Sequence, residues 1–134
     1  MDDYRSNNIL PAWYGLTLTI AGAAGSITGN LVLEQSSQFE LHQIFGSSDQ
    51  DADTDFMPNN FSLSITDNST GRQFMNIRIP QRNLCAPSNG GYRLLRPVIF
   101  PPLANLTFDA LDLSAHANVI TISLAGYKIY GGVQ

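Results

Sequence analysis

The stretch that decides the fold class is FSLSITDNSTGRQFMNIRIP, residues 61–80. Its first half alternates the apolar residues Phe61, Leu63 and Ile65 with Ser and Thr, and a period of two is typical of a β-strand with one buried face. The run DNSTG, residues 67–71, follows, and Asp, Asn and Gly readily adopt the backbone conformations of a tight turn. A second alternating run then leads to Pro80, which ends it. The stretch therefore predicts a β-hairpin.

The same alternation recurs on both sides of this hairpin. We expect the first two strands to form another hairpin across the small residues 21–26. In the last strand the alternation slips at Gly126, which predicts a β-bulge there. Apart from the hairpin, the expected strands lie at residues 13–21, 27–34, 38–45 and 118–130, a further strand begins with Leu106 and Phe108, and a short apolar piece lies at 98–100.

These patterns define the fold class and the domain organisation. No stretch longer than about ten residues has a helical period. Seven or eight strands separated by turn signals predict an all-β fold, a single antiparallel β-sandwich of the jelly-roll or Ig-like kind. Residues 1–12 have no usable period, so we expect an extended N-terminal arm there and a β-sandwich domain over residues 13–134.

Low charge is the unusual feature of the composition. Asp, Glu, Lys and Arg make up 13% of the 134 residues, against a usual share of about 25%. Ser, Thr, Asn and Gln are numerous in their place, with 12, 8, 11 and 7 residues. The net charge of −4 and the single lysine, Lys128, argue against a nucleic-acid-binding protein, which needs clustered cations.

Other classes are excluded by what the sequence lacks. No apolar run approaches the ~20 residues of a membrane-spanning helix, so we expect no membrane partner. The first residues, MDDYR, are charged and precede no apolar signal-peptide core, so we expect synthesis in a cytoplasm. The single Cys85 excludes an internal disulfide and a cysteine-based zinc site.

An acidic run invites comparison with calcium-binding loops, since hard cations prefer several oxygen ligands. Counted from Asp49, the sixth position holds Thr54 instead of Gly and the twelfth holds Asn60 instead of Glu. We therefore interpret the run as a solvated acidic loop and nominate no metal site there. The sequence alone does not decide whether the loop binds a cation. Its residues are Asp49, Asp51, Asp53 and Asp55.

The sequence indicates no catalytic site and no cofactor. Its two histidines, His42 and His116, lie far apart in the sequence, and no G-x-S-x-G nucleophile motif occurs. Cys85 has no CxxC partner and lies between Leu84 and Ala86, which is typical of a buried thiol. We expect the protein not to be an enzyme.

Arginine is concentrated in one part of the chain. Apart from Arg5, every arginine lies between positions 72 and 96, and the arginine fork favours defined contacts with carboxylates or carbonyls. An acidic region and a basic region suit a subunit that docks on copies of itself or on a larger assembly, although pairing within the chain remains the alternative. The candidate partner-binding residues are Tyr4, Arg5, Trp13, Arg72, Arg78, Arg82, Arg93 and Arg96.

Four stretches between residues 60 and 130 resemble a known family. They are TDNSTGRQFMN (66–76), YRLLRP (92–97), ANLTF (104–108) and ISLAGYKIY (122–130). They are similar to strand-and-turn patterns of the small all-β structural proteins of tailed bacteriophages, which decorate capsids or form appendages of the virion. The resemblance implies a non-enzymatic virion protein and three-fold or five-fold oligomers.

Two hypotheses about function follow. The first is a virion structural subunit (a decoration, cement or head-appendage protein) that is made in the host cytoplasm and binds capsid or other virion proteins and copies of itself. The second is a carbohydrate-binding sandwich module, or a receptor-binding or tail component. In it Trp13 stacks on sugars together with Tyr14, Tyr92, Tyr127 and Tyr130, although packing in the sandwich would equally explain these aromatic residues. A hydrolase is a distant third possibility, because it needs placed carboxylates that the sequence does not single out.

Overall fold

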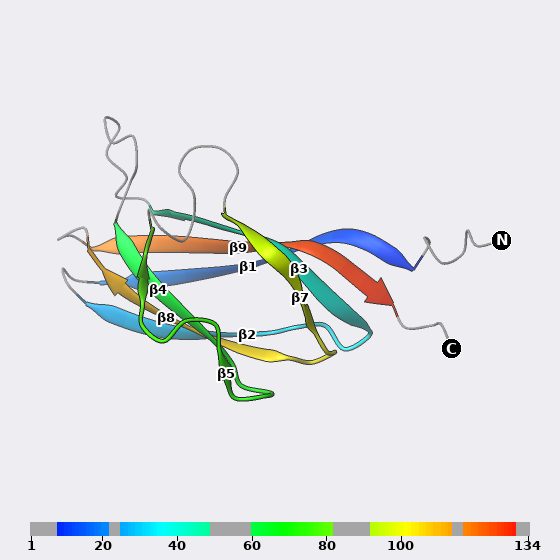
Figure 1. The fold of residues 1–134 in the computed structure, drawn as a ribbon. Coiled ribbons are helices and arrows are strands. Elements are labelled where there is room, and N and C mark those ends of the chain that lie inside the picture. The colour runs from blue at the N-terminus through cyan, green and yellow to red at the C-terminus, as the bar shows by residue number, and fades with distance from the viewer. Residues whose placement is uncertain (1–7, 22–24, 49–59, 82–91, 114–116, 131–134) are drawn as a thin grey trace.

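The computed structural model describes residues 8–21, 25–48, 60–81, 92–113 and 117–130 (Figure 1). Several residues singled out from the sequence lie outside these ranges. They are Tyr4, Arg5, Arg82, Cys85, His116 and the four aspartates of the acidic run.

The described chain consists of β-strands and their connections, which confirms the all-β prediction. Within the described ranges, the structure has no helix of the length and apolarity that a membrane crossing requires. The strands are β1 (Ile9–Ile20), β2 (Ser26–Val32), β3 (Ser37–Ser48), β4 (Phe61–Asp67), β5 (Arg72–Gln73), β6 (Ile79–Pro80), β7 (Tyr92–Phe100), β8 (Asn105–Asp112) and β9 (Asn118–Tyr130).

The strands form two antiparallel sheets packed as a sandwich. A four-stranded sheet has the order β1-β9-β3-β7, and a five-stranded sheet has the order β2-β8-β4-β5 with β6 also paired to β4. Figure 1 shows them as two layers, with β1 and β9 in one and β2 and β8 in the other. The predicted β-sandwich is therefore confirmed.

The strand pairing separates the two kinds of sandwich that the sequence left open. The pairs are nested: β1 with β9, β2 with β8, β3 with β7 and β4 with β5. This is a long antiparallel ribbon with its turn at the β4–β5 hairpin, rolled up so that the strands of each arm alternate between the sheets, which is the jelly-roll arrangement. In an Ig-like sandwich the first two strands share a sheet, whereas here β1 and β2 lie in different sheets.

The core lies between the sheets and is built from the residues that the alternation indicated. Phe61, Leu63 and Ile65 of β4 are at most 1% exposed. They face buried residues of the other sheet, including Ile122 and Leu124 of β9. Strands such as β4, β8 and β9 thus bury one apolar face between the sheets, as the alternation indicated.

Two of the expected pairings differ from the structure. The hairpin predicted between strands 13–21 and 27–34 is wrong, since these residues form β1 and β2 of different sheets. The alternation does not distinguish a hairpin from two strands in different sheets, because in both arrangements each strand buries one face in the same core.

The hairpin of residues 61–80 exists, but its return strand is interrupted. Arg72–Gln73 and Ile79–Pro80 pair with β4, and the residues between them leave the sheet. Tertiary contacts explain the break, since the Phe74 ring packs against Phe100 at 5.7 Å between centroids. Met75 Sδ also accepts a hydrogen bond of 3.1 Å from the Ile65 amide, which replaces a ladder contact.

Strand β1 begins before the predicted domain boundary. Ile9–Ala12 pair with Gly126–Ile129 of β9, and the Tyr130 amide donates a hydrogen bond to the Asn8 carbonyl oxygen at 2.8 Å. Residues 9–12 of the predicted arm are therefore strand residues. For residues 1–7, which lie outside the described ranges, the arm stays a prediction.

Candidate functional site

A β-bulge in strand β3 shapes the outer face of the four-stranded sheet. Leu41 and Gln43 of β3 are partners of Gly126 and Ala125, which are consecutive in β9, so His42 is the extra residue. On the other side of β9, Ala12 and Trp13 of β1 are the partners of Gly126 and Ala125, and the register of that pairing is unbroken. The predicted bulge therefore lies at the expected place, but the extra residue belongs to β3 and not to β9.

The bulge changes which side chains of β3 point outward. Leu41 and Ile44 are both buried, at 1% and 2% exposure, although three positions separate them. An unbroken strand would place them on opposite faces. Because the bulge resets the alternation, His42 and Gln43 both reach the outer face, where they line one pocket.

Gly126 allows the two strands to approach at this point. A Cβ atom on Gly126 would overlap with the carbonyl oxygen of Glu40 in β3. The position therefore requires glycine for close contact of two backbones. The preceding residue, Ala125, has a small side chain opposite Trp13, and it lines the outer face of the sheet at this position.

The neighbouring edge of the sheet is also irregular. Strand β7 is the edge strand of the four-stranded sheet, and its pairing with β3 has a register shift. Val98 is the partner of Leu41, whereas the partner of Gln43 is Arg93. The residues between them, 94–97, bulge from the edge. Leu95 in this segment is 95% exposed, and Arg96 beside it is exposed as well.

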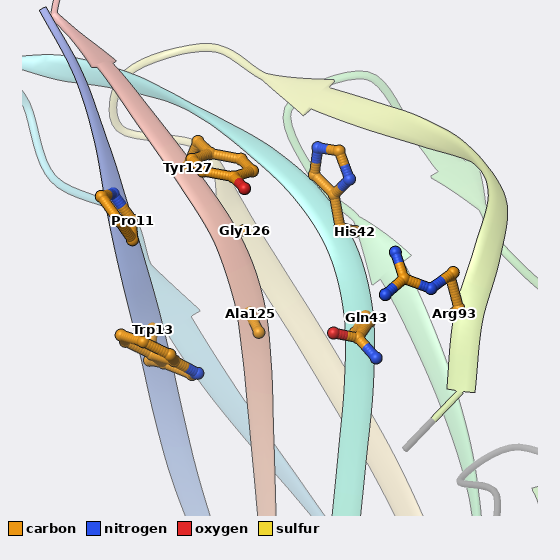
Figure 2. A pocket seen from close by; sticks show the side chains of 8 residues that line it. All are labelled: Pro11, Trp13, His42, Gln43, Arg93, Ala125, Gly126 and Tyr127. Atoms are coloured by element: carbon orange, nitrogen blue, oxygen red, sulfur yellow. The ribbon is translucent and has the colours of Figure 1, made fainter. Parts of the chain in front are cut away.

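A shallow pocket of about 180 Å³ lies over the bulge. Figure 2 shows Trp13 of β1 on one side of Ala125 and Gly126, and His42, Gln43 and Arg93 on the other. Its lining residues are Pro11, Trp13, His42, Gln43, Arg93, Ala125, Gly126 and Tyr127.

The side chains around the pocket combine exposed aromatic surface with polar groups. The Trp13 side chain is among the most exposed large apolar groups of the described chain, at 67%. Tyr127 meets the His42 ring edge-on, with centroids 5.2 Å apart. His42 Nε2 is buried and has no hydrogen-bond partner among the described residues; Glu40 Oε1 is 3.6 Å away. Such a surface can bind a ligand through stacking and hydrogen bonds.

A separate polar cluster ties the connection between β2 and β3 to β9. Lys128 Nζ lies 2.7 Å from Glu34 Oε1 and 5.1 Å from the centroid of the Tyr14 ring. The Glu34 amide donates a hydrogen bond of 3.0 Å to the Tyr14 hydroxyl oxygen. The hydrogen bond from Lys128 is the main cause that lowers the pKa of Glu34 to about 2, and its counterpart raises the pKa of Lys128. We interpret this cluster as structural.

The tyrosines nominated for sugar stacking lie at different places in the structure. Tyr127 lines the pocket, whereas Tyr14 packs against Phe39 of the core at 4.9 Å between centroids. Tyr130 is half-buried near Glu34. The side chain of Tyr92 lies outside the description. Trp13 and Tyr127 are thus the aromatic residues of this set that the pocket brings together.

The candidate arginines do not share one surface. Arg72 is exposed on β5 of the five-stranded sheet, and Arg78 pairs with Asp109 at 3.1 Å. Arg93 and Arg96 are exposed on β7 of the four-stranded sheet. Of the predicted partner-binding residues, Trp13 and Arg93 therefore meet at the pocket. His42 and Gln43 are its members that sequence reasoning did not nominate, and the slip of alternation at Gly126 is the signal that marks their place.

The described residues offer no evident metal site, since none of their His, Cys, Asp and Glu side chains gather in groups of three or more that could hold an ion. The acidic run lies outside these residues, so the structure does not test it.

Comparisons with known proteins place the chain among distant structural neighbours. No protein-family model matches it, and no curated protein does. The core of the Drosophila NLP protein, described in connection with pentamer formation and histone binding, is 15% identical, with a TM-score of 0.36 over 84% of this chain and 96% of that one.

Viral capsid proteins are also among the similar solved structures. The VP2 subviral particle of infectious bursal disease virus is 12% identical, with a TM-score of 0.38 over 93% of this chain and 33% of that one. A chain of Sulfolobus turreted icosahedral virus is 16% identical, with a TM-score of 0.45 over 92% of this chain and 39% of that one. The chain thus spans less than half of each of these two viral chains. Because each of these TM-scores is below 0.5, the fold class rests on strand order and pairing.

Proposed function

We propose that the chain is a non-enzymatic structural subunit of a virus particle, a capsid-associated protein that docks on the particle and on copies of itself. The jelly-roll topology supports this proposal, because jelly rolls are recurrent building blocks of viral capsids. The resemblance of residues 60–130 to structural proteins of tailed bacteriophages points the same way. A decoration, cement or head-appendage role is the specific form of the proposal, and the virion is then its location.

One observation carries the docking part of the proposal. The bulged segment 94–97 at the edge of the four-stranded sheet presents Leu95 almost fully to solvent, next to the exposed Arg96. Arginine is enriched in interface hot spots, where the guanidinium pairs with an acceptor, and an exposed apolar side chain beside it gains free energy when a partner removes it from water. Burial of Leu95 in a contact is therefore favourable.

Charge complementarity indicates the second copy as one occupant of this edge. The chain carries a net charge of −4, and four of its aspartates occur at alternate positions from 49 to 55. The acidic run of one copy is a suitable partner for Arg96 of the next. Such a contact weakens as salt screens the charges.

The test is the oligomeric state of the purified chain, measured by light scattering over a range of protein and salt concentrations. We expect wild type to self-associate, and the double variant Leu95→Ser, Arg96→Ser to be monomeric at the same concentrations. Arg72→Ser is the matched control, because it removes an exposed arginine from the other sheet. A wild type that stays monomeric at all concentrations would contradict the self-docking proposal. Co-sedimentation of both variants with virions that lack the chain then tests docking on the particle.

A further inference from the structure

The pocket at the His42 bulge has a floor formed by strand β9 and two chemically different walls. The backbone of Gly126 and the methyl group of Ala125 line the floor. One wall is the exposed indole of Trp13, and the other holds the polar ends of His42, Gln43 and Arg93 (Figure 2). A small ring standing between the two walls would contact both at once.

The polar wall contains an unsatisfied group. His42 Nε2 is buried without a hydrogen-bond partner among the described residues. Buried polar atoms are normally hydrogen-bonded, and an unpartnered one calls for an explanation. The edge-on contact with Tyr127 holds the ring of His42 at the pocket. A hydroxyl group of a ligand can hydrogen-bond with an imidazole nitrogen as donor or as acceptor, whichever tautomer is present.

The size of the pocket restricts the ligand. Its volume of about 180 Å³ is smaller than the roughly 300–1,000 Å³ of sites for drug-sized ligands. The space suits one small ring. The carboxylate of Glu40, 3.6 Å from His42 Nε2, makes the inner end unfavourable for an anion such as phosphate. Neutral hydroxyl groups fit that end, and the exposed Arg93 supplies further donors at the rim.

We infer that this pocket binds one pyranose ring of a glycan, which stacks on Trp13 and hydrogen-bonds with its hydroxyls to His42 and Arg93. A pyranose has an apolar face of C–H groups and a rim of hydroxyls, and these two features match the two walls. Tyr127 acts as a positioning residue, because it holds the His42 ring. The inference goes beyond the proposed function and does not depend on segment 94–97.

Trp13 makes the binding directly measurable, since it is the only tryptophan of the chain. The probes are methyl glycosides of glucose, galactose, mannose, N-acetylglucosamine and glucuronic acid, each titrated into the full chain. We expect saturable quenching of Trp13 fluorescence with at least one neutral glycoside, and saturation-transfer NMR signals from the protons of its apolar face. If no glycoside gives either signal, the inference is overturned.

Variants identify the pocket as the site, with binding measured by saturation-transfer NMR. We expect Trp13→Ala to weaken binding about tenfold or more, and Trp13→Phe to restore part of it, because the phenyl ring still stacks. His42→Ala should weaken binding, while His42→Gln, which keeps a hydrogen-bonding group, should weaken it less. Thermal unfolding of the histidine variants shows whether the bulge survives.

Ile99→Ala is the matched control. Like Trp13, Ile99 is an exposed apolar residue of the four-stranded sheet, at 56%, but it belongs to β7 and lies outside the pocket. We expect it to bind the glycoside like wild type. A protein partner covering the whole face would instead be weakened by both Trp13→Ala and Ile99→Ala. That outcome, with no glycoside bound, would contradict the glycan site and leave the docking test at Leu95 and Arg96 unaffected.

Discussion

Gly126 of β9 lies against the carbonyl oxygen of Glu40 in β3, so closely that any side chain at position 126 would overlap with it. The contact occurs where His42 bulges from β3, and the register on the other side of β9 is unbroken. The close approach therefore belongs to the bulge. Gly126 is also among the residues that line the pocket, so the close approach lies next to the proposed binding surface.

Gly126→Ala should destabilise the protein by at least about 2 kcal/mol, because the added methyl group forces two backbones apart in a packed sheet. Gly15→Ala is the control, since its Cβ would find Ile122 O at 3.9 Å, an ordinary contact, and we expect a change of less than about 1 kcal/mol there. Urea denaturation followed by circular dichroism measures both. Equal stabilities of the two variants would show that the close approach at Gly126 is not needed.

The sequence predicted the strands better than their partners. Alternation at Phe61, Leu63 and Ile65 reports that one face is buried, and all three are core residues. It does not report which strand lies alongside, because in a sandwich both sheets bury their faces in the same core. For this reason β1 and β2 were expected to pair although they lie in different sheets.

The candidate site was predictable in part. Trp13 has the same parity as the outward Thr17 and Thr19, whereas Tyr14 has the parity of the buried Leu18, so their opposite faces follow from the sequence. His42 and Gln43 share a face through the bulge, and a bulge depends on the close backbone approach of a strand distant in sequence. The interruption at Phe74 and Met75 has the same kind of cause, since Phe100 and Ile65 provide their contacts.

The Glu34–Lys128 pair should make stability sensitive to acid. The pKa of Glu34 is lowered from 4.5 to about 2 in the folded chain. The folded state therefore binds fewer protons, and the stabilisation is present above pH 4.5 and is lost as the pH falls towards 2. Lys128→Met keeps an unbranched side chain and removes the charge, so the pKa of Glu34 should return towards its ordinary value. Urea denaturation at several pH values should show a smaller loss of stability between pH 4.5 and 2 in this variant. Identical pH profiles would contradict the role of the pair.

Two truncations should separate the predicted arm from the sandwich. Removing residues 1–7 should leave thermal stability unchanged, because β1 begins at Ile9. Removing residues 1–11 also deletes three residues that pair with β9, and we expect a loss of about 2 kcal/mol from the hydrogen bonds involved. Calorimetry distinguishes the two. If the candidate partner-binding residues Tyr4 and Arg5 contact the particle, the shorter truncation also reduces co-sedimentation with virions while the protein stays folded. A large loss of stability on removing residues 1–7 would instead assign them to the sandwich.

Asn118 should be the most sensitive polar residue of the interior. It is 1% exposed, accepts a hydrogen bond from the Ser48 hydroxyl, and donates to Asp112 Oδ1 and to the Asn60 carbonyl oxygen at 3.2 Å each. Asn118→Ala removes these contacts beside the buried carboxylate of Asp112, so we expect a loss of about 3 kcal/mol. Asn30→Ala is the control, because Asn30 is exposed and accepts one hydrogen bond from Thr107, and its loss should stay within about 0.5 kcal/mol. Chemical denaturation gives the free energy of unfolding of both variants. If Asn118→Ala is as stable as wild type, the role of the Asn118 amide is contradicted, and water replaces it at this end of the sandwich.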